Sequence, residues 1–232
     1  MRHISTYKPE VISVLSICPR YAGDSCVAIM TAKERPGDRP IFRVDWMEAH
    51  DLLKTARRAR DVLWAKKPNG DALYPDLTII ADETAVGRPG MDSLTTRIGF
   101  TPVGFHVSGT VTRDPSEKDQ LEHLAPIDLV GMLQSVTSHK RLQVPLDCPE
   151  RADLRNEMAA LEQDGETVKG HEAIRVRTVG LGIWWCARAL GDSFQADMPP
   201  SDDPMAIDLQ GQKDMQASMA DDLGLTEDEI DM

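Results

Sequence analysis

The feature that most constrains the fold is the short run Leu-Thr-Ile-Ile-Ala at residues 77–81, which is followed directly by Asp82 and Glu83. A continuous apolar run of five residues, preceded by a Pro- and Gly-containing turn, is typical of a strand that is buried on both faces. Such a strand needs a layer of helices on each side. The run therefore predicts an α/β sheet with residues 77–81 in its interior.

The segments around this strand predict the rest of the sheet. Apolar, β-rich runs at residues 11–17 and 25–30 flank a turn and predict a hairpin, and residues 41–44 add a third antiparallel strand. Further elements follow from apolar periodicity. They are helices at about 47–67, 90–98, 127–138, 150–163 and 178–190, strands at 103–108 and 141–144, and a charged loop at 110–123. The predicted fold class is a mixed sheet, a three-stranded antiparallel meander plus parallel strands, with helices on both faces.

The charge is distributed unevenly along the chain. The net charge is −12, but residues 197–232 contain eleven acidic residues and one basic residue, so the remaining residues are nearly neutral. We predict a folded domain at residues 1–195 and an acidic tail at 196–232 with too little apolar surface to fold alone. The apolar residues spaced along the tail allow it to bind a groove on a partner or the basic helix of its own domain. A purely solubilising role is the alternative.

The basic residues of the body gather in one segment, and this segment is the candidate for DNA contact. They are Lys54, Arg57, Arg58, Arg60, Lys66 and Lys67. Clustered cations bind phosphates, although a solvated helix face is the simpler interpretation. The scattered cysteines predict neither a zinc site nor disulfides. The sequence contains no phosphate-binding loop of an ATPase, no apolar run long enough for a membrane span and no secretory leader, so we expect an intracellular protein.

Residues 82–89, Asp-Glu-Thr-Ala-Val-Gly-Arg-Pro, resemble the Asp-x-Thr-Gly-Val-Gly-x-Pro segment of phage terminase large-subunit nuclease domains. Residues 102–109, 127–134 and 140–142 resemble later segments of that family in the same order. The resemblance covers roughly residues 11–190. It implies an RNase H-like fold, a role in DNA packaging and a location in the cytoplasm of a bacterial host cell, as a phage- or prophage-encoded protein.

The metal-binding residues of that family are incomplete in this chain. RNase H-like nucleases use several converging carboxylates to hold two divalent ions about 4 Å apart. Cys18 stands where the family has its first Asp, and residues 178–181 have no carboxylate where its final helix has two. Asp82 is the one matched ligand, with Glu83 beside it and Glu172 as the best substitute, followed by Asp128. We therefore expect Mg²⁺ or Mn²⁺ to bind weakly or not at all.

One main hypothesis about function and two alternatives follow from these observations. The main hypothesis is a terminase-nuclease-like domain that has lost its catalysis and acts in DNA packaging, or binds DNA or protein. Its alternatives are an active metal-dependent endonuclease module of a split terminase and a non-enzymatic interaction protein that kept the fold. The expected partners are DNA and a separate terminase ATPase or other phage protein that binds the tail 197–232. No membrane partner is expected.

Overall fold

The computed structural model describes residues 11–35, 38–107, 121–164 and 167–190. The acidic tail, its predicted boundary at 195–196 and most of the predicted loop at 110–123 lie outside the described residues. None of the helices in the described ranges is long and apolar enough to cross a membrane.

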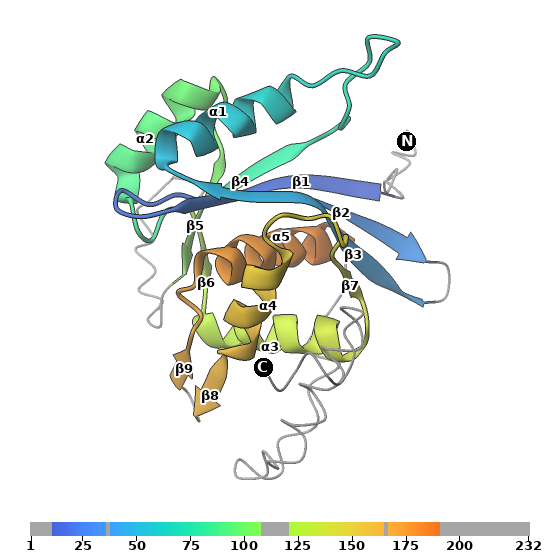
Figure 1. Cartoon of the computed structure of the whole chain (residues 1–232), viewed down its shortest axis with the longest axis vertical. Helices are drawn as coiled ribbons and strands as arrows, with labels where there is room; N and C mark the ends of the chain where they lie inside the picture. The colour runs from blue at the N-terminus through green and yellow to red at the C-terminus, as the bar shows by residue number, and fades with distance from the viewer. Residues whose placement is uncertain (1–10, 36–37, 108–120, 165–166, 191–232) are drawn as a thin grey trace, which may run out of the picture.

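One mixed sheet organises the described chain (Figure 1). Its strands are β1 (Val11–Cys18), β2 (Ser25–Arg35), β3 (Asp38–His50), β4 (Thr78–Asp82), β5 (Val103–Val107), β6 (Leu121–Leu124) and β7 (Leu142–Gln143), in the order β6-β5-β4-β1-β2-β3-β7. The strands β1, β2 and β3 form an antiparallel meander, whereas β4 pairs in parallel with β1 and β5, as do β5 with β6 and β3 with β7. This confirms the predicted fold class and the interior position of β4, and it is consistent with an RNase H-like sheet.

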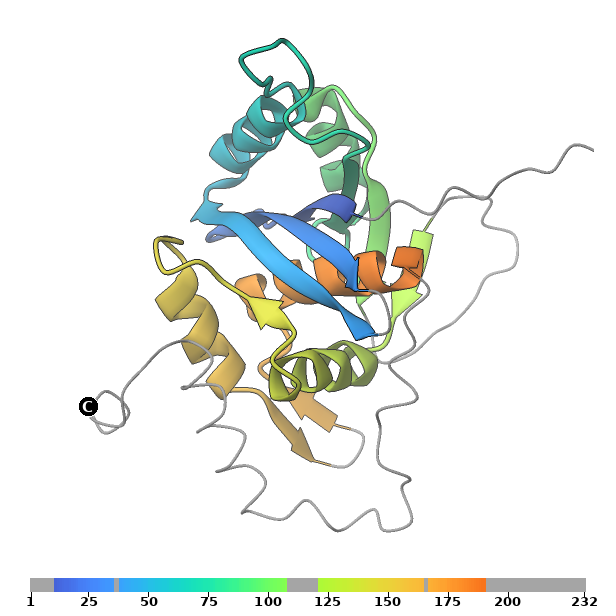
Figure 2. The ribbon, with the colours of Figure 1, turned by 90° about the vertical axis from the view of Figure 1, so that its right-hand side faces the viewer.

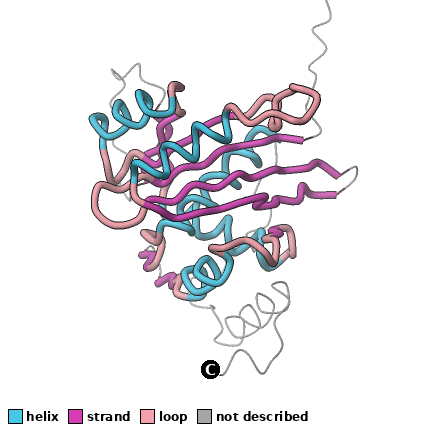
Figure 3. The backbone as a smooth tube through the Cα atoms, turned by 45° about the horizontal axis from the view of Figure 1, so that its top comes forward, coloured by secondary structure: helices cyan, strands magenta, loops and turns pink. Residues whose placement is uncertain are grey.

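Helices cover both faces of the sheet, as predicted. The helices α1 (Leu52–Leu63) and α2 (Gly87–Ile98) lie on one face, which Figure 3 shows from their side. The other face carries α5 (Ile174–Leu190), with α3 (Pro126–Ser138) and α4 (Arg151–Ala159) packed against it; Figure 2 shows α5 directly beneath the strands. The sheet is therefore the middle layer, and a separate small hairpin of β8 (Glu162–Asp164) and β9 (Thr167–Lys169) lies away from it, near α3 and α4 (Figure 1).

The alternation of side chains along β4 decides which layer each residue meets. Ile79 and Ala81 belong to the apolar cluster beneath α1 and α2, whereas Ile80 belongs to the cluster that contains α5. Successive strand residues point to opposite faces. Asp82 therefore follows Ile80 onto the face that α5 covers, and this places a carboxylate against the first turn of that helix.

The helix predicted at 47–67 begins later and ends earlier than expected. Residues 47–50 extend β3, where Met47 pairs with Ala28 and is fully buried. The helix α1 starts after Asp51, whose carboxylate accepts a hydrogen bond of 2.9 Å from the backbone N–H of Lys54. The apolar residues at 46, 47 and 49 fit either a strand or a helix, and pairing with β2 decides between the two.

Three other boundaries differ from the prediction. Residues 121–124 form β6 and not the end of a loop, and residues 162–164 form β8 and not the last turn of the helix predicted at 150–163. The final helix starts at Ile174, four residues before the predicted start at 178. Its first turns contain Arg175 and Arg177, whose charges hide the apolar periodicity in the sequence.

Candidate functional site

The candidate site surrounds the carboxylate of Asp82. This residue ends β4 in the middle of the sheet, and its side chain has no exposed surface. One oxygen, Oδ1, accepts a hydrogen bond of 2.9 Å from the backbone N–H of Thr84. A buried ionised carboxylate needs a compensating charge, because burial removes its hydration. The group that supplies this charge contacts the other oxygen, Oδ2.

Arg177 supplies the compensating charge from the first turns of α5. Its Nη1 lies 2.8 Å from Oδ2 of Asp82, and Arg177 itself is only 6% exposed. Its Nε donates a hydrogen bond of 3.0 Å to the backbone carbonyl of His171. The guanidinium is thus held by two partners at a buried position directly beside the carboxylate.

Cys18 completes the immediate surroundings of Asp82. The strands β1 and β4 pair in parallel with Ile17 opposite Ala81, so Cys18 is brought next to Asp82. Its Sγ lies 3.6 Å from Oδ2 of Asp82 and donates to it. Burial and, next, the negative charge of Asp82 raise the pKa of the Cys18 thiol well above its usual value. At neutral pH Cys18 is therefore a neutral thiol, which adds no negative charge to the site.

The helix α5 contributes no carboxylate to this site. Thr178 uses its hydroxyl to donate to the carbonyl of Ile174 at 2.6 Å, and Val179 and Gly180 are buried. A Cβ atom at Gly180 would lie 2.9 Å from Cγ of Leu129 on α3, closer than ordinary van der Waals contact. The close packing of α5 against α3 therefore leaves no room for an acidic side chain at residue 180.

The other predicted ligands do not reach Asp82. The side chain of Glu172 is exposed, and only its backbone carbonyl is engaged, by the guanidinium of Arg20. Glu83 is half-buried and its backbone N–H donates to the carbonyl of Phe105, which continues the ladder to β5. Asp128 is exposed in the first turn of α3. Of the predicted metal ligands, only Asp82 lies in the site.

These residues do not fit a two-metal centre. Within the ranges that the structure describes, no three His, Cys, Asp or Glu side chains are grouped so that they could hold a metal ion. The one central carboxylate already has an arginine partner, and a metal ion would have to displace the Arg177 guanidinium from a buried position. Sequence reasoning missed Arg177, because an arginine in a stretch of alternating charged and apolar residues resembles a solvated residue.

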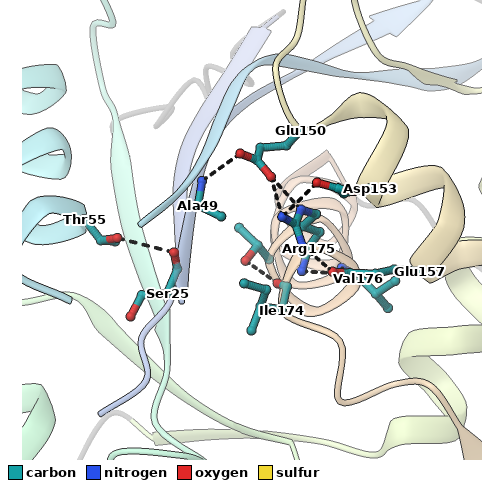
Figure 4. A network of polar contacts seen from close by, with 10 residues as sticks. Ser25, Ala49, Thr55, Glu150, Asp153, Glu157, Ile174, Arg175 and Val176 are labelled. Atoms are coloured by element: carbon teal, nitrogen blue, oxygen red, sulfur yellow. Dashed lines mark hydrogen bonds and ion pairs between the residues drawn. The ribbon is translucent and has the colours of Figure 1, made fainter. Parts of the chain in front are cut away.

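A second arginine of α5 fixes the start of this helix (Figure 4). Arg175 contacts the carboxylates of Glu150, Asp153 and Glu157 at 2.6 to 3.2 Å. Glu157 also accepts from the backbone N–H groups of Arg175 and Val176, in the first turn of the helix. Burial lowers the pKa of Arg175, but its carboxylate partners outweigh this effect and raise it.

The network reaches the sheet as well, because Glu150 accepts a hydrogen bond of 3.3 Å from the backbone N–H of Ala49 on β3 (Figure 4). Glu150 also precedes α4 directly, so one carboxylate joins α4, α5 and β3. We infer that this network holds the first turn of α5 in place and thereby sets the position of Arg177 over Asp82.

The predicted DNA-binding residues divide into two groups. Five of them have exposed side chains, namely Lys54, Arg57, Arg60, Lys66 and Lys67. Arg58 differs, because its guanidinium pairs with the carboxylate of Glu48 at 2.9 Å and lies 5.0 Å above the ring of Trp46. Burial raises the pKa of Glu48, but hydrogen bonds from Arg58 and His50 outweigh it and lower this pKa. Arg58 therefore holds α1 to β3.

The exposed cations do not line the Asp82 site. The strand β3 runs in the same direction as β1 and β4, so all three end on the same side of the sheet. The helix α1 follows β3 and runs back toward the side where β4 begins (Figures 1 and 3). Twelve helical residues span about 18 Å. Lys66 and Lys67 therefore lie toward the opposite edge of the sheet from Asp82, and α1 covers the face opposite α5.

Fold and site together define an α/β protein with a mixed sheet, in which an arginine neutralises the one buried carboxylate at the ends of the central strands. Comparisons with protein-family models, with curated proteins and with solved structures found no match for this chain.

Proposed function

We propose that this chain is a terminase-nuclease-like domain in which an internal ion pair has replaced the metal chemistry, and that it serves DNA packaging as a DNA- or protein-binding component. The observation that carries the proposal is the buried contact between Arg177 and Asp82. The resemblance of residues 82–89 to the terminase segment, directly after the central strand, supports the family assignment.

The loss of catalysis follows from the charge of the site. A two-metal nuclease needs enough negative charge to hold two divalent ions and to activate water between them. Around Asp82, the thiol of Cys18 is neutral and the guanidinium of Arg177 is positive, so the site is close to neutral before any metal arrives. Arginine stays protonated at any accessible pH, so raising the pH does not free the carboxylate.

The first prediction concerns metal binding and cleavage. Calorimetric titration of the full chain with Mg²⁺ or Mn²⁺ should give no binding that depends on Asp82, because a metal ion would have to displace Arg177 from a buried carboxylate. Incubation with supercoiled plasmid and either ion should give equal background nicking by the native chain and by Asp82→Ala. Asp128→Ala removes an exposed carboxylate and is the control. Two-ion binding or cleavage that Asp82→Ala abolishes would contradict the proposal.

The second prediction concerns DNA contact through α1. The double variant Arg57→Glu/Arg60→Glu should weaken binding to a DNA duplex at least about tenfold at low salt. The slope of log affinity against log salt should also become shallower by about 2, because two phosphate contacts are lost. Fluorescence anisotropy across a salt series measures both quantities.

The control for this prediction is Arg97→Glu, which reverses one exposed charge on α2. It should leave both the affinity and the slope nearly unchanged. Equal affinities and slopes for the native chain and the α1 double variant would reject DNA binding by this helix, and the protein-binding version of the proposal would remain to explain the exposed cations.

A further inference from the structure

The outward side of α1 carries a mixed apolar and basic stripe. Leu53, Arg57, Arg60 and Trp64 follow one another at intervals of four, three and four residues, so they lie within about 60° of one another around the helix axis. Leu53 is 55% exposed and Trp64 is 65% exposed, and both arginines are exposed. We call these four residues the outer stripe of α1.

Packing of α1 on the sheet keeps the outer stripe facing outward. Thr55, Ala56 and Ala59 are buried on the opposite side of the helix, and Arg58 is tied to Glu48 on β3. The helix cannot turn its apolar residues inward without losing these contacts. Leu53 and Trp64 thus stay largely uncovered by the described residues, at the two ends of the stripe.

The composition of the outer stripe favours one kind of ligand. A phosphate backbone would pair with Arg57 and Arg60, but it offers no apolar partner to Leu53. An acidic amphipathic helix satisfies all four residues, since its apolar side chains cover the ends of the stripe and its carboxylates pair with the cations between them.

The chain itself contains such a segment. If the acidic tail forms a helix there, Met219, Leu223 and Ile230 would fall on one side of it, within about 40° of one another. Met219 and Ile230 are eleven residues apart, which is also the spacing of Leu53 and Trp64, and five acidic residues lie between them. Asp222 and Glu227 would flank this apolar side.

The length of the chain permits the contact. The 28 residues between the end of α5 at Leu190 and Met219 could span about 90 Å if fully extended. Gly224 makes helix formation in this segment about 1 kcal/mol less favourable, so we expect the segment to become helical only when it binds to the outer stripe.

We propose that residues 219–230 dock on the outer stripe of α1 as an amphipathic helix. Met219 and Ile230 contact the two apolar ends of the stripe, and the flanking acids pair with Arg57 and Arg60. This contact covers two of the cations that we propose bind DNA, so the tail competes with DNA for the same surface. The contact itself does not depend on the proposed function, because it forms without DNA.

Amide hydrogen exchange of the full chain at low salt tests this proposal. Exchange within residues 219–230 should be slowed in the native protein, and the protection should fall at least tenfold in Arg57→Glu/Arg60→Glu. Arg97→Glu, which changes an exposed charge elsewhere, should keep it. Adding Asp222→Lys/Glu227→Lys to the α1 double variant should restore the protection, because the two charge reversals compensate each other.

Three outcomes would overturn the proposal. The first is fast exchange of residues 219–230 in the native protein at low salt. The second is protection that persists in Arg57→Glu/Arg60→Glu, since the segment would then dock elsewhere. The third is protection that increases with protein concentration together with dimer formation in sedimentation, since a second copy would then supply the segment. Failure of the chain to bind DNA would overturn the DNA-binding version of the proposed function but leave this protection unchanged.

Discussion

Arg177→Met should lower the free energy of unfolding by about 3–5 kcal/mol, the cost expected when one partner of a buried ion pair is removed. The substitution keeps a long side chain at the site but leaves the carboxylate of Asp82 without its cation, at a position with no exposed surface. The hydrogen bond from Thr84 and the weak donor of Cys18 remain, and neither supplies a full positive charge. Urea unfolding at neutral pH measures the change.

A double-mutant cycle separates the ion pair from general packing. Asp82→Asn removes the charge of the carboxylate at nearly constant size, and the double variant with Arg177→Met should be less destabilised than the sum of the two single variants. Arg97→Met changes an exposed arginine on α2 and should stay within about 0.5 kcal/mol of the native protein. A loss below about 1 kcal/mol for Arg177→Met, or strictly additive losses, would mean that the pair does not stabilise the fold.

Gly180→Asp should destabilise the protein by more than about 4 kcal/mol or prevent folding, because it combines overpacking with a buried unpaired charge. Residue 180 lies where the resemblance places a metal-binding carboxylate. In this structure a Cβ at that position would contact three side-chain carbons of Leu129 at 2.9 to 3.2 Å. A longer, charged side chain would have to push α3 away from α5 in the core.

Gly180→Ala is the matched control for this substitution. It adds the Cβ without the charge, so overpacking should lower the free energy of unfolding by about 1–3 kcal/mol. The higher helix propensity of alanine should offset up to about 1 kcal/mol of this loss. Unfolding curves of the two variants under the same conditions give the comparison. A Gly180→Asp protein as stable as Gly180→Ala would show that the space near Leu129 is easily opened.

If both results are obtained, two-metal chemistry at this site would require several concerted changes. Cys18 would have to become acidic, Arg177 would have to leave Asp82, and α3 would have to make room for a carboxylate on α5. We expect each change alone to destabilise the present packing, since the site is built around one negative and one positive side chain. This is why we favour a binding role over weak residual catalysis.

Apolar patterns in the sequence predicted the central elements correctly. The hairpin of β1 and β2, the interior strand β4 and the helix α3 were all expected near their observed positions, because apolar runs and apolar periodicity directly reflect which residues are buried. The position of Asp82 at the end of the central strand was also expected. The proximity of Cys18 to it was implied only by the resemblance, and the parallel pairing of β1 with β4 places the two side chains together.

Long-range pairing decided the boundaries that the sequence left open. Residues 47–50 join β3 because β2 provides a partner for them, and residues 121–124 form a strand beside β5. The early start of α5 depends on carboxylates of Glu150, Asp153 and Glu157, which are distant in sequence and accept the charge of Arg175. A local pattern contains no information about such partners.

The sequence by itself determined the layered α/β fold, the carboxylate at the end of the central strand and the absence of carboxylates at residues 18 and 178–181, because each of these depends on local composition or on spacing along the chain. Only the tertiary structure decided which group pairs with that carboxylate. Arg177 lies 95 residues away from Asp82 in sequence, and its charge resembles that of a solvated helix residue until α5 packs on the sheet. The energy of a buried charge depends on its neighbours in space, and these are set by the packing of whole elements.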